Sequence, residues 1–365
     1  MSCVTLKVGR NSSPMNSITH SKHPLIGLNL IELEYICNQF REPSFRAKQL
    51  FSWLYKNKVN SFGQIRNFPL ELRKKFDIQY DIHPLTLIRM TGSTTEPTRK
   101  FLFRLQTGEM IESVVMKDKN RTTICLSSQV GCAVDCQFCA TASMGFQKNL
   151  TAGEIVDQFI QVHSHVEHPI THVVFMGMGE PFLNYKPVIA AANLLHDKNG
   201  INLGAKRITI STVGIVPIIY RYTDEKHRYK LAVSLNGSSQ ESRIKTMPIA
   251  RKYPLSELMN AIDYYTEHSG QPVTCEYVLM DGINDDINDA KKLINLLSSR
   301  RTKLNIIPYN EIGGEYKRPS ENKLNTFSHA MDRANFPVMI RWSKGTDIAA
   351  GCGQLAIIEK QTNRE

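Results

Sequence analysis

The chain has 365 residues, of which 41% are hydrophobic, 8% aromatic and 22% charged, a globular composition with length for one large domain and a small one. Its formal net charge of +11 favours contact with phosphate groups. No apolar run approaches the roughly 18–20 residues needed to cross a bilayer, and no secretory signal follows the first charges. We therefore exclude a membrane partner and expect a cytoplasmic protein.

The first part of the chain is predicted to hold a tail and a small helical domain. The first 31 residues contain no acidic residue, which is a property of both transit peptides and disordered termini, and we interpret residues 1–23 as a disordered tail. In residues 24–88, Ala47, Leu50, Phe51 and Leu54 fall at i, i+3, i+4 and i+7, the spacing of an amphipathic helix. A helical accessory domain is expected here.

Basic residues are concentrated in this domain. Between residues 41 and 76, nine basic residues stand against the acidic Glu42 and Glu71, a net charge of +7. The nine are Arg41, Arg46, Lys48, Lys56, Lys58, Arg66, Arg73, Lys74 and Lys75. Such a segment can bind phosphates, although a solvated helix face would have the same composition.

The next segments alternate between strands and helices. The runs 100–105 and 110–117 flank the turn-prone Thr107-Gly108 and predict a β-hairpin, which we place in a linker over 89–120. Further strands are predicted at 122–127, 172–176, 207–212, 230–235, 273–279, 304–309 and 338–342. Helices are predicted between them, one beginning at Thr151 with Glu154 in a capping box and one ending at Gly270. Repeated βα units indicate a parallel sheet, either doubly wound or a complete or partial barrel.

The cysteines predict a metal centre. Three of the eight, Cys132, Cys136 and Cys139, lie within eight residues after the first of these strands, and the scatter of the others is a poor disulfide framework. The C-x3-C-x2-C spacing can ligate three irons of a 4Fe–4S cluster and leave the fourth iron open. The alternative is a structural zinc site completed by Cys125, Cys275 or a histidine.

Short polar segments follow several predicted strands. They are Gly179-Glu180, Ser211, Ser234-Leu235-Asn236 and Asn310. Such residues commonly do no more than terminate strands. However, the carboxyl ends of successive strands are also where barrel chemistry gathers, and all of these residues fall at that end. The cysteine spacing, with the aromatic Phe138 before Cys139, resembles the radical-SAM superfamily, and that resemblance implies that these residues bind S-adenosylmethionine.

A narrower resemblance comes from four further motifs. Residues 127–132, 177–181, 210–214 and 347–355 together resemble the RlmN/Cfr methyltransferases, and residues 45–50 with Trp53-Leu54-Tyr55 are similar to the accessory domain of RlmN. The match runs from about residue 25 to residue 356. It implies an α/β fold: a radical-SAM partial (β/α)6-type barrel over 121–345, with a helical accessory domain, a β-hairpin linker and a C-terminal tail over 346–365.

The resemblance also implies roles for residues outside the cysteine triplet. Cys352 accepts a methyl group as S-methylcysteine, Cys125 resolves the covalent protein–RNA adduct through a transient disulfide with Cys352, and Glu112 is the proton acceptor. Two molecules of S-adenosylmethionine are consumed per turnover, with one 4Fe–4S cluster per chain. Without the resemblance, Cys125 would be interpreted as a core cysteine and Glu112 as a solvated strand residue.

The implied substrates are RNAs. RlmN-type enzymes methylate carbon 2 of adenosine 2503 in 23S rRNA, before full ribosome assembly, and of adenosine 37 in tRNAs, whereas Cfr acts on carbon 8. Pro181, Gly145-Phe146 and Arg341-Trp342 favour RlmN. Asn236 and Gly351 stand where many members have histidine and alanine. Residues 41–76 become the expected RNA-binding surface, and the other expected partner is a flavodoxin-type electron donor to a monomeric enzyme.

Two other classes of function stay open on the sequence alone. One is a radical-SAM enzyme that acts on a small molecule or a protein, in which Cys352 would be dispensable. The other is a non-catalytic, zinc-containing RNA-binding module, which would hold no iron.

Overall fold

A ten-stranded mixed sheet forms the centre of the computed structural model, which describes residues 22–93 and 96–355. The strand order is β14-β13-β12-β11-β10-β9-β6-β5-β4-β3. Of the predicted tail over 1–23, all but the last two residues lie outside the described part of the chain. Within that part, no helix has the length and apolar character that a membrane span requires.

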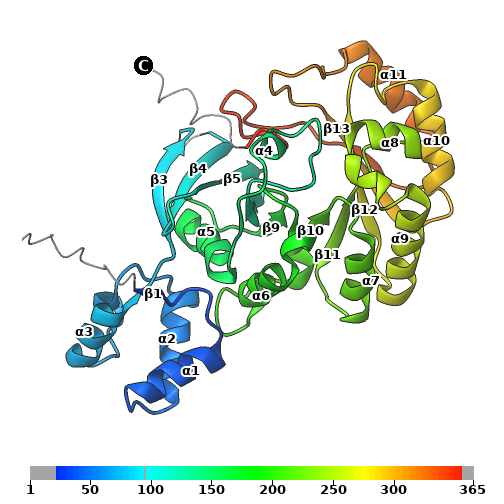
Figure 1. Ribbon diagram of the computed structural model, residues 1–365. Helices are drawn as coiled ribbons and strands as arrows, with labels where there is room; N and C mark the ends of the chain where they lie inside the picture. The colour runs from blue at the N-terminus through cyan, green and yellow to red at the C-terminus, as the bar shows by residue number, and fades with distance from the viewer. Residues whose placement is uncertain (1–21, 94–95, 356–365) are drawn as a thin grey trace, which may run out of the picture.

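The larger part of the sheet is parallel and forms the barrel-like core (Figure 1). Its strands are β6 (Arg121–Cys125), β9 (His172–Phe175), β10 (Ile208–Thr212), β11 (Lys230–Ser234), β12 (Val273–Leu279), β13 (Thr302–Pro308) and β14 (Val338–Ile340). Neighbours pair in parallel throughout. Each lies within two residues of the predicted position at either end, which confirms the predicted α/β class.

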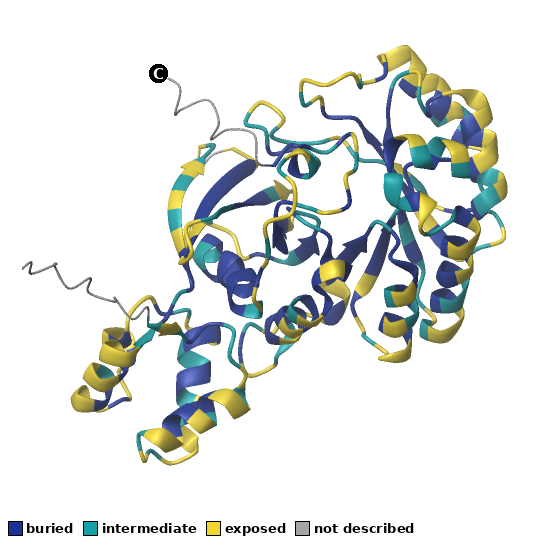
Figure 2. Ribbon diagram, in the orientation of Figure 1, coloured by how far each residue is buried: buried dark blue, intermediate teal, exposed yellow. Residues whose placement is uncertain are grey.

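Helices connect the parallel strands. They are α4 (Ala140–Ser143), α5 (Ala152–Ser164), α6 (Tyr185–His196), α7 (Val216–Asp224), α8 (Gln240–Thr246), α9 (Leu255–Ser269), α10 (Ile287–Leu297) and α11 (Glu321–Met331), with the 3-10 turns η3 (Pro181–Asn184), η4 (Ala205–Arg207) and η5 (Pro248–Arg251). The predicted helix ends are confirmed: Thr151 and Glu154 form a capping box, and Gly270 is left-handed with φ 65°. Figure 2 shows buried strands inside a layer of helices that are exposed on their outer faces.

The predicted hairpin forms and is continuous with the barrel sheet. Its strands are β4 (Thr98–Leu105) and β5 (Met110–Asp118), and β5 pairs with β6. A further antiparallel strand, β3 (Leu85–Thr91), pairs with β4 and was not predicted. The remaining strands form two short sheets. In one, β1 (His23–Pro24) pairs with β2 (Tyr80–Asp81), and in the other, β7 (Gln129–Val130) pairs with β8 (Lys148–Asn149).

The N-terminal region, residues 22–82, is mainly helical. Its helices are α1 (Leu30–Gln39), α2 (Phe45–Phe51), the π-helical turn η1 (Ser52–Lys56), the 3-10 turn η2 (Phe62–Gln64) and α3 (Leu70–Gln79). The predicted apolar stripe of Ala47, Leu50, Phe51 and Leu54 is buried. Because α2 continues into η1, that stripe spans two elements rather than one regular helix.

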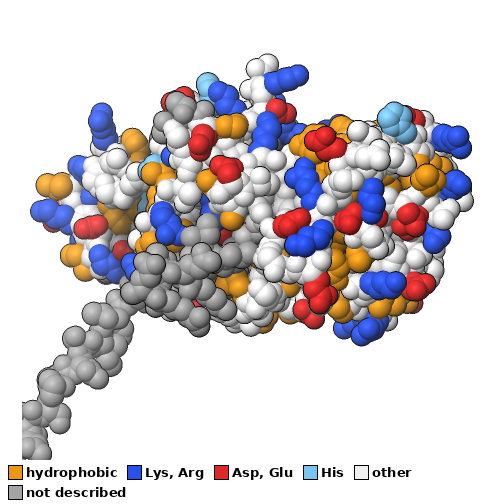
Figure 3. Space-filling view, turned by 90° about the horizontal axis from the view of Figure 1, so that it is seen from above, with side chains coloured by type: hydrophobic (Ala, Val, Ile, Leu, Met, Phe, Trp, Pro, Cys, Tyr) orange, Lys and Arg blue, Asp and Glu red, His pale blue; other side chains and the backbone are white. Residues whose placement is uncertain are grey.

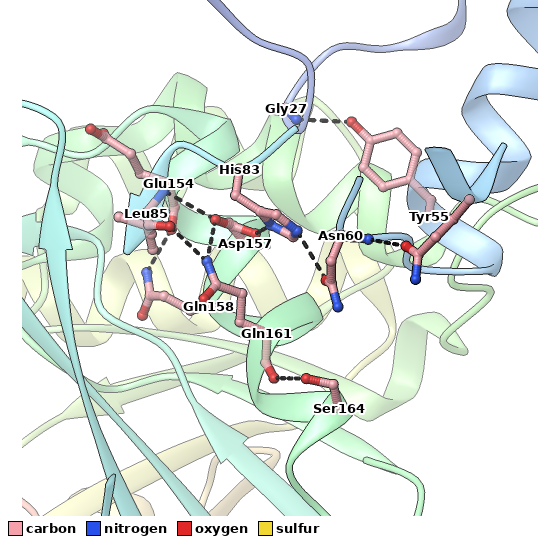
Figure 4. A network of polar contacts seen from close by, with 11 residues as sticks. Gly27, Tyr55, Asn60, His83, Leu85, Glu154, Asp157, Gln158, Gln161 and Ser164 are labelled. Atoms are coloured by element: carbon pink, nitrogen blue, oxygen red, sulfur yellow. Dashed lines mark hydrogen bonds and ion pairs between the residues drawn. The ribbon is translucent and has the colours of Figure 1, made fainter. Parts of the chain in front are cut away.

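A polar network joins the N-terminal region to α5 of the barrel (Figure 4). Asp157 on α5 accepts a hydrogen bond from the backbone N–H of Leu85, 3.1 Å away, and its other oxygen lies 2.6 Å from Nδ1 of His83. Nε2 of His83 in turn lies 3.2 Å from Oδ1 of Asn60 in the N-terminal region. At a second contact, a Cβ on Gly27 would lie 2.5 Å from Cα of Gly153. The close backbone approach and the buried carboxylate fix the N-terminal region against the barrel.

Candidate functional site

The cysteine triplet lies on a loop whose two ends are fastened together. β7 before the loop pairs with β8 after it, and the N–H of Cys132 donates to the carbonyl of Gly145 at 3.1 Å. Gly131 has φ 70°, and a Cβ there would lie 1.6 Å from that same carbonyl oxygen. Only glycine fits this crossing, so Gly131 brings the ends of the loop together and holds Cys132, Cys136 and Cys139 in one compact segment.

The three thiols influence one another electrostatically. Burial raises the pKa of Cys132 to about 12, with smaller contributions from Glu180 and Cys139. Burial also raises the pKa of Cys136 well above its ordinary value, and the charges of Cys139 and Cys132 raise it further. Thiolates at these positions therefore need a cationic partner, which iron provides.

The residues present fit a 4Fe–4S cluster. Within residues 22–93 and 96–355, no three His, Cys, Asp or Glu side chains are arranged around a single metal ion. A cluster makes a different demand, because each thiolate binds its own iron. Cys275, which we considered as a fourth zinc ligand, is fully buried in the main hydrophobic core.

Glu180 is a buried carboxylate beside this loop, at the end of the turn that follows β9. Its two oxygens accept hydrogen bonds from the N–H groups of Phe182 and Val213, at 2.9 and 2.8 Å. A Cβ on Gly179, which has φ 93°, would lie 2.4 Å from Cβ of Gln129, so the turn can approach β7 this closely only with glycine. Burial raises the pKa of Glu180 to about 7, so a cationic ligand would stabilise its charged form.

Ser211 and Ser234 lie in the last two residues of the neighbouring strands β10 and β11, and Asn310 lies two residues after β13, so each is at the carboxyl end of a strand, as predicted. Nδ2 of Asn310 donates to Oγ of Ser343 and to the carbonyl of Cys352, at 2.8 and 3.0 Å. Its Oδ1 is buried and has no hydrogen-bond partner among the described residues. A buried acceptor of this kind fits a polar ligand.

Leu235 and Asn236 differ from Asn310, because their side chains are occupied by contacts within the protein. The Leu235 side chain is fully buried. Oδ1 of Asn236 accepts a hydrogen bond from the N–H of Val278 at 2.8 Å, and its backbone is left-handed with φ 48°, a conformation that asparagine tolerates. Both side chains therefore shape the turn after β11, and their contact with a ligand stays a prediction.

Strand register places Glu112 and Cys125 on one face of the sheet. Val114 pairs with Cys125 across β5 and β6, and Glu112 lies two residues from Val114 on the same strand. Residues that pair directly, and residues two apart, project to the same face. Glu112 is buried, so the alternative interpretation of a solvated strand residue is wrong.

The C-terminal segment, residues 343–355, carries Cys352 to this region. It lies beside α4 in Figure 1, and the N–H of Ala140 donates to the carbonyl of Gly353 at 2.7 Å. Cys352 is exposed to solvent, yet burial, followed by the charge of Cys139, raises its pKa to about 11. The thiol is therefore accessible and lies near Cys139 of the cysteine loop.

Cys125 and Cys352 lie close enough to interact electrostatically. Burial raises the pKa of Cys125 to about 12, and the charge of Cys352 is the next contribution. Among the described residues every cysteine is a free thiol. The structure therefore brings two reduced thiols, Glu112 and the cysteine triplet to one region.

Gly351 explains one departure from the family pattern. A Cβ at this position would lie 2.7 Å from Oε1 of Gln354 and 2.8 Å from Nδ2 of Asn310. Glycine therefore lets the segment pack directly on Asn310. An alanine here would require both side chains to shift.

Sequence reasoning missed two buried cations. Arg243 on α8 is fully buried and donates to the carbonyls of Val213, Ser234 and Leu235. Lys100 on β4 is buried between Glu112 and the C-terminal segment. Neither could be identified from the sequence, because a lysine or arginine within a polar stretch is ordinarily exposed.

The basic segment 41–76 divides into two groups. Arg46, Lys58 and Arg73 are half-buried and donate to the backbone carbonyls of Asn67, Lys56 and Gly63, so they stabilise the fold. The exposed bases are Arg41, Lys48, Lys56, Arg66, Lys74 and Lys75. Figure 3 shows Lys and Arg side chains on the N-terminal region and also across the barrel. The surface charge is thus not confined to residues 41–76.

Comparisons with known proteins match both parts of the chain. Residues 23–82 match the ribosomal RNA large subunit methyltransferase N-terminal domain, and residues 126–294 match the radical SAM superfamily. The chain is 38% identical to the probable dual-specificity RNA methyltransferase RlmN 3 of Opitutus terrae, over 93% of this chain and 96% of that protein. It is 41% identical to a probable dual-specificity RNA methyltransferase RlmN of Syntrophomonas wolfei, over 93% and 98%.

A solved structure is similar over nearly the whole chain. It is a radical SAM methyltransferase from Sphaerobacter thermophilus, with 40% sequence identity and a TM-score of 0.89, covering 91% of this chain and 99% of that one. The similarity therefore includes the N-terminal region as well as the barrel.

Proposed function

The chain belongs to the RlmN family of radical-SAM RNA methyltransferases, and on that premise we propose that it methylates carbon 2 of adenosine 2503 in 23S rRNA and of adenosine 37 in tRNAs. Its cofactors are a 4Fe–4S cluster and S-adenosylmethionine, and its substrates are RNAs. The observation that carries the proposal is the gathering of Glu112, Cys125 and Cys352 beside the cysteine loop.

The cofactors are assigned to two sets of residues. Cys132, Cys136 and Cys139 would hold the cluster. S-adenosylmethionine would be held by Gly179, Glu180, Ser211, Ser234, Leu235, Asn236 and Asn310, with the buried Glu180 carboxylate suited to a cationic amino group. When bound, the cluster and S-adenosylmethionine supply a methyl group and a carbon-centred radical.

Radical chemistry suits the target atom. Carbon 2 of adenine lies between two ring nitrogens, is electron-poor and has no lone pair, so it cannot attack a methyl sulfonium as a nitrogen or thiolate would. A carbon unit carried on the Cys352 sulfur can instead be joined to this atom by radical addition.

Glu112 and Cys125 complete the reaction after the carbon unit has joined the base. The adduct formed by radical addition carries one unpaired electron, which the cluster, when bound, would take back, and Glu112 accepts the proton from carbon 2. The Cys125 thiolate attacks the Cys352 sulfur, the sulfur–carbon bond breaks with its electron pair going to carbon, and that carbon takes a proton to become a methyl group. The two cysteines are oxidised to a disulfide, which a thiol reductant must reduce before the next turnover.

RNA binding requires that the adenine be unstacked, at a cost of about a few kcal/mol. Phosphate contacts from the exposed bases Arg41, Lys48, Lys56, Arg66, Lys74 and Lys75 can offset that cost. We further propose a monomeric, cytoplasmic enzyme that acts on 23S rRNA before full ribosome assembly and receives electrons from a flavodoxin-type donor.

Mass spectrometry of RNA from cells with and without this gene tests the proposal. Nucleosides released from 23S rRNA and from tRNA should contain 2-methyladenosine only when the gene is present. Loss of 8-methyladenosine instead would assign the chain to carbon 8, and unchanged RNA would contradict the proposed substrates.

A further inference from the structure

Lys100 is a buried charged residue that the reaction described above does not use. Its side chain is 2% exposed, and Nζ lies 3.1 Å from Oε1 of Glu112, whose side chain is 5% exposed. Lysine is almost never fully buried unless it is paired. The pairing of this buried lysine with Glu112, the proposed proton acceptor, therefore requires an explanation.

Lys100 makes a second contact, to the segment that carries Cys352. Nζ donates to the backbone carbonyl of Ala349 at 3.3 Å. Ala349 is three residues before Cys352 and has a left-handed backbone with φ 51°, which for alanine costs about 1–3 kcal/mol. The ammonium therefore contacts the segment where its backbone is strained.

Sheet register explains how one lysine reaches both partners. Lys100 pairs with Val114, and Val114 pairs with Cys125 on the next strand. Lys100, Glu112 and Cys125 therefore project from the same face of the sheet. Nearby, a Cβ on Gly345 would lie 2.5 Å from Cγ2 of Thr98, so the C-terminal segment packs directly on this face.

We propose that Lys100 is a positioning residue for RNA methylation: by holding the Glu112 carboxylate and the Ala349 carbonyl on one ammonium, it fixes the proton acceptor relative to the Cys352 sulfur. This inference rests on the proposed function, since it assigns Glu112 and Cys352 the roles given there. A base must be held within about 0.5 Å of its productive position to act efficiently. Lys100 supplies that constraint from a rigid strand.

A purely structural role makes a different prediction. A buried ion pair that serves only folding would, when broken, lower the free energy of unfolding and slow every catalytic step to a similar extent. A positioning residue that acts through Glu112 would slow proton removal and have little effect on methylation of the Cys352 thiol, which does not use Glu112. The two roles are separated by measuring both steps.

The test uses the cluster-loaded enzyme, S-adenosylmethionine, a chemical reductant and a transcribed 23S rRNA fragment that spans adenosine 2503. Methylation of Cys352 is followed by mass spectrometry of its peptide, and RNA product by nucleoside analysis. For Lys100→Met we expect product formation to fall at least about 30-fold, less than the roughly 10²–10⁴-fold for complete loss of a base because Glu112 is still present, while Cys352 methylation falls less than about 3-fold. Covalent protein–RNA adduct should accumulate.

Lys323→Met is the control. The half-exposed Lys323 ammonium pairs with the carboxylates of Asp281 and the buried Asp285, at 2.6 and 3.4 Å, and among the described residues it makes no ion pair with a proposed catalytic group. We expect it to change product formation less than about 3-fold. Lys100→Met with product formation within about 3-fold of wild type would overturn the inference. Equal losses in Cys352 methylation and in RNA product formation would also overturn the inference.

A double variant keeps the test decisive if Lys100→Met does not fold. Lys100→Met combined with Glu112→Gln removes both charges, and it is compared with Glu112→Gln alone. If Lys100 acts through Glu112, the added substitution lowers product formation less than about 3-fold; a further loss of tenfold or more shows independent action and contradicts the proposal. Wild-type enzyme that forms neither S-methylcysteine nor methylated adenosine would instead contradict the proposed function.

Discussion

Replacing Arg243 tests how the carboxyl end of the barrel is held together. The guanidinium is fully buried and donates to the carbonyls of Val213, Ser234 and Leu235, which follow or end β10 and β11. On the same helix, the carbonyl of Thr246 accepts a hydrogen bond from the N–H of Gln137 in the cysteine loop at 3.0 Å. Arg243 thus connects two strand ends and, through α8, the loop.

The loss in free energy of unfolding that we expect for Arg243→Met follows from these contacts. Hydrogen bonds to a charged donor contribute about 1.5–3 kcal/mol each, and Arg243→Met removes three of them. The substitution also recovers the cost of burying a charge, several kcal/mol, a cost visible in the lowering of the Arg243 pKa to about 10 by burial. The free energy of unfolding should fall by about 3 kcal/mol. The thermal midpoint should fall by about 5–10 °C.

Denaturant unfolding of cluster-free protein measures this loss, and iron per chain after reconstitution measures the effect on the loop. Iron content should fall, because the charge of Cys136 acts on Arg243 in the structure and the cation favours thiolate there. Arg243→Lys keeps the charge with fewer donors and should lose about half as much stability. Arg251→Met, at an exposed arginine, is the control and should change stability by less than about 0.5 kcal/mol. An Arg243→Met protein within about 1 kcal/mol of wild type would refute this reasoning.

Three further predictions concern the thiols, the buried carboxylate and the basic surface. Cys125→Ala should still form S-methylcysteine at Cys352 but should accumulate covalent protein–RNA adduct on denaturing gels, and free turnover would contradict its role. The folded-state pKa of Glu180 is raised to about 7 from 4.5, so the native protein binds more protons than the unfolded chain between these values. The free energy of unfolding of the cluster-free protein should therefore fall as pH rises from 4.5 through 7, by up to about 3 kcal/mol. Glu180→Gln should remove this pH dependence. Parallel plots of stability against pH for the wild type and the variant would contradict the prediction. Charge reversal at Lys74 and Lys75, which are exposed, should weaken RNA binding and its salt dependence without affecting cleavage of S-adenosylmethionine, and unchanged affinity would remove this surface from the account.

The strands could be predicted from the sequence because each is a short apolar run bounded by turn residues. The capping box at Thr151 and the left-handed Gly270 were predictable for a similar reason, since both are local signals. β3 was not predicted, although its residues alternate in burial. Its side chains Ile88 and Met90 are exposed, so its hydrophobicity did not show which face was buried.

The candidate site was predictable only in part, for a physical reason. Cys132, Cys136 and Cys139 are close in sequence, so their spacing alone indicates a shared ligand. Lys100 meets Glu112 only because of the register between β4 and β5, and Arg243 reaches three carbonyls on segments distant in sequence. Contacts of that kind depend on tertiary packing, which a single sequence does not specify.

The most direct test of methyl transfer through Cys352 is to trace the transferred carbon. Enzyme whose Cys352 has been methylated with deuterated S-adenosylmethionine is freed of that reagent and given unlabelled S-adenosylmethionine, reductant and RNA for one turnover. We expect a 2-methyladenosine whose methyl group retains two deuterium atoms, because the carbon comes from Cys352 after loss of one hydrogen. An unlabelled methyl group on the RNA, with label left on Cys352, would contradict transfer of the carbon from Cys352 to adenine.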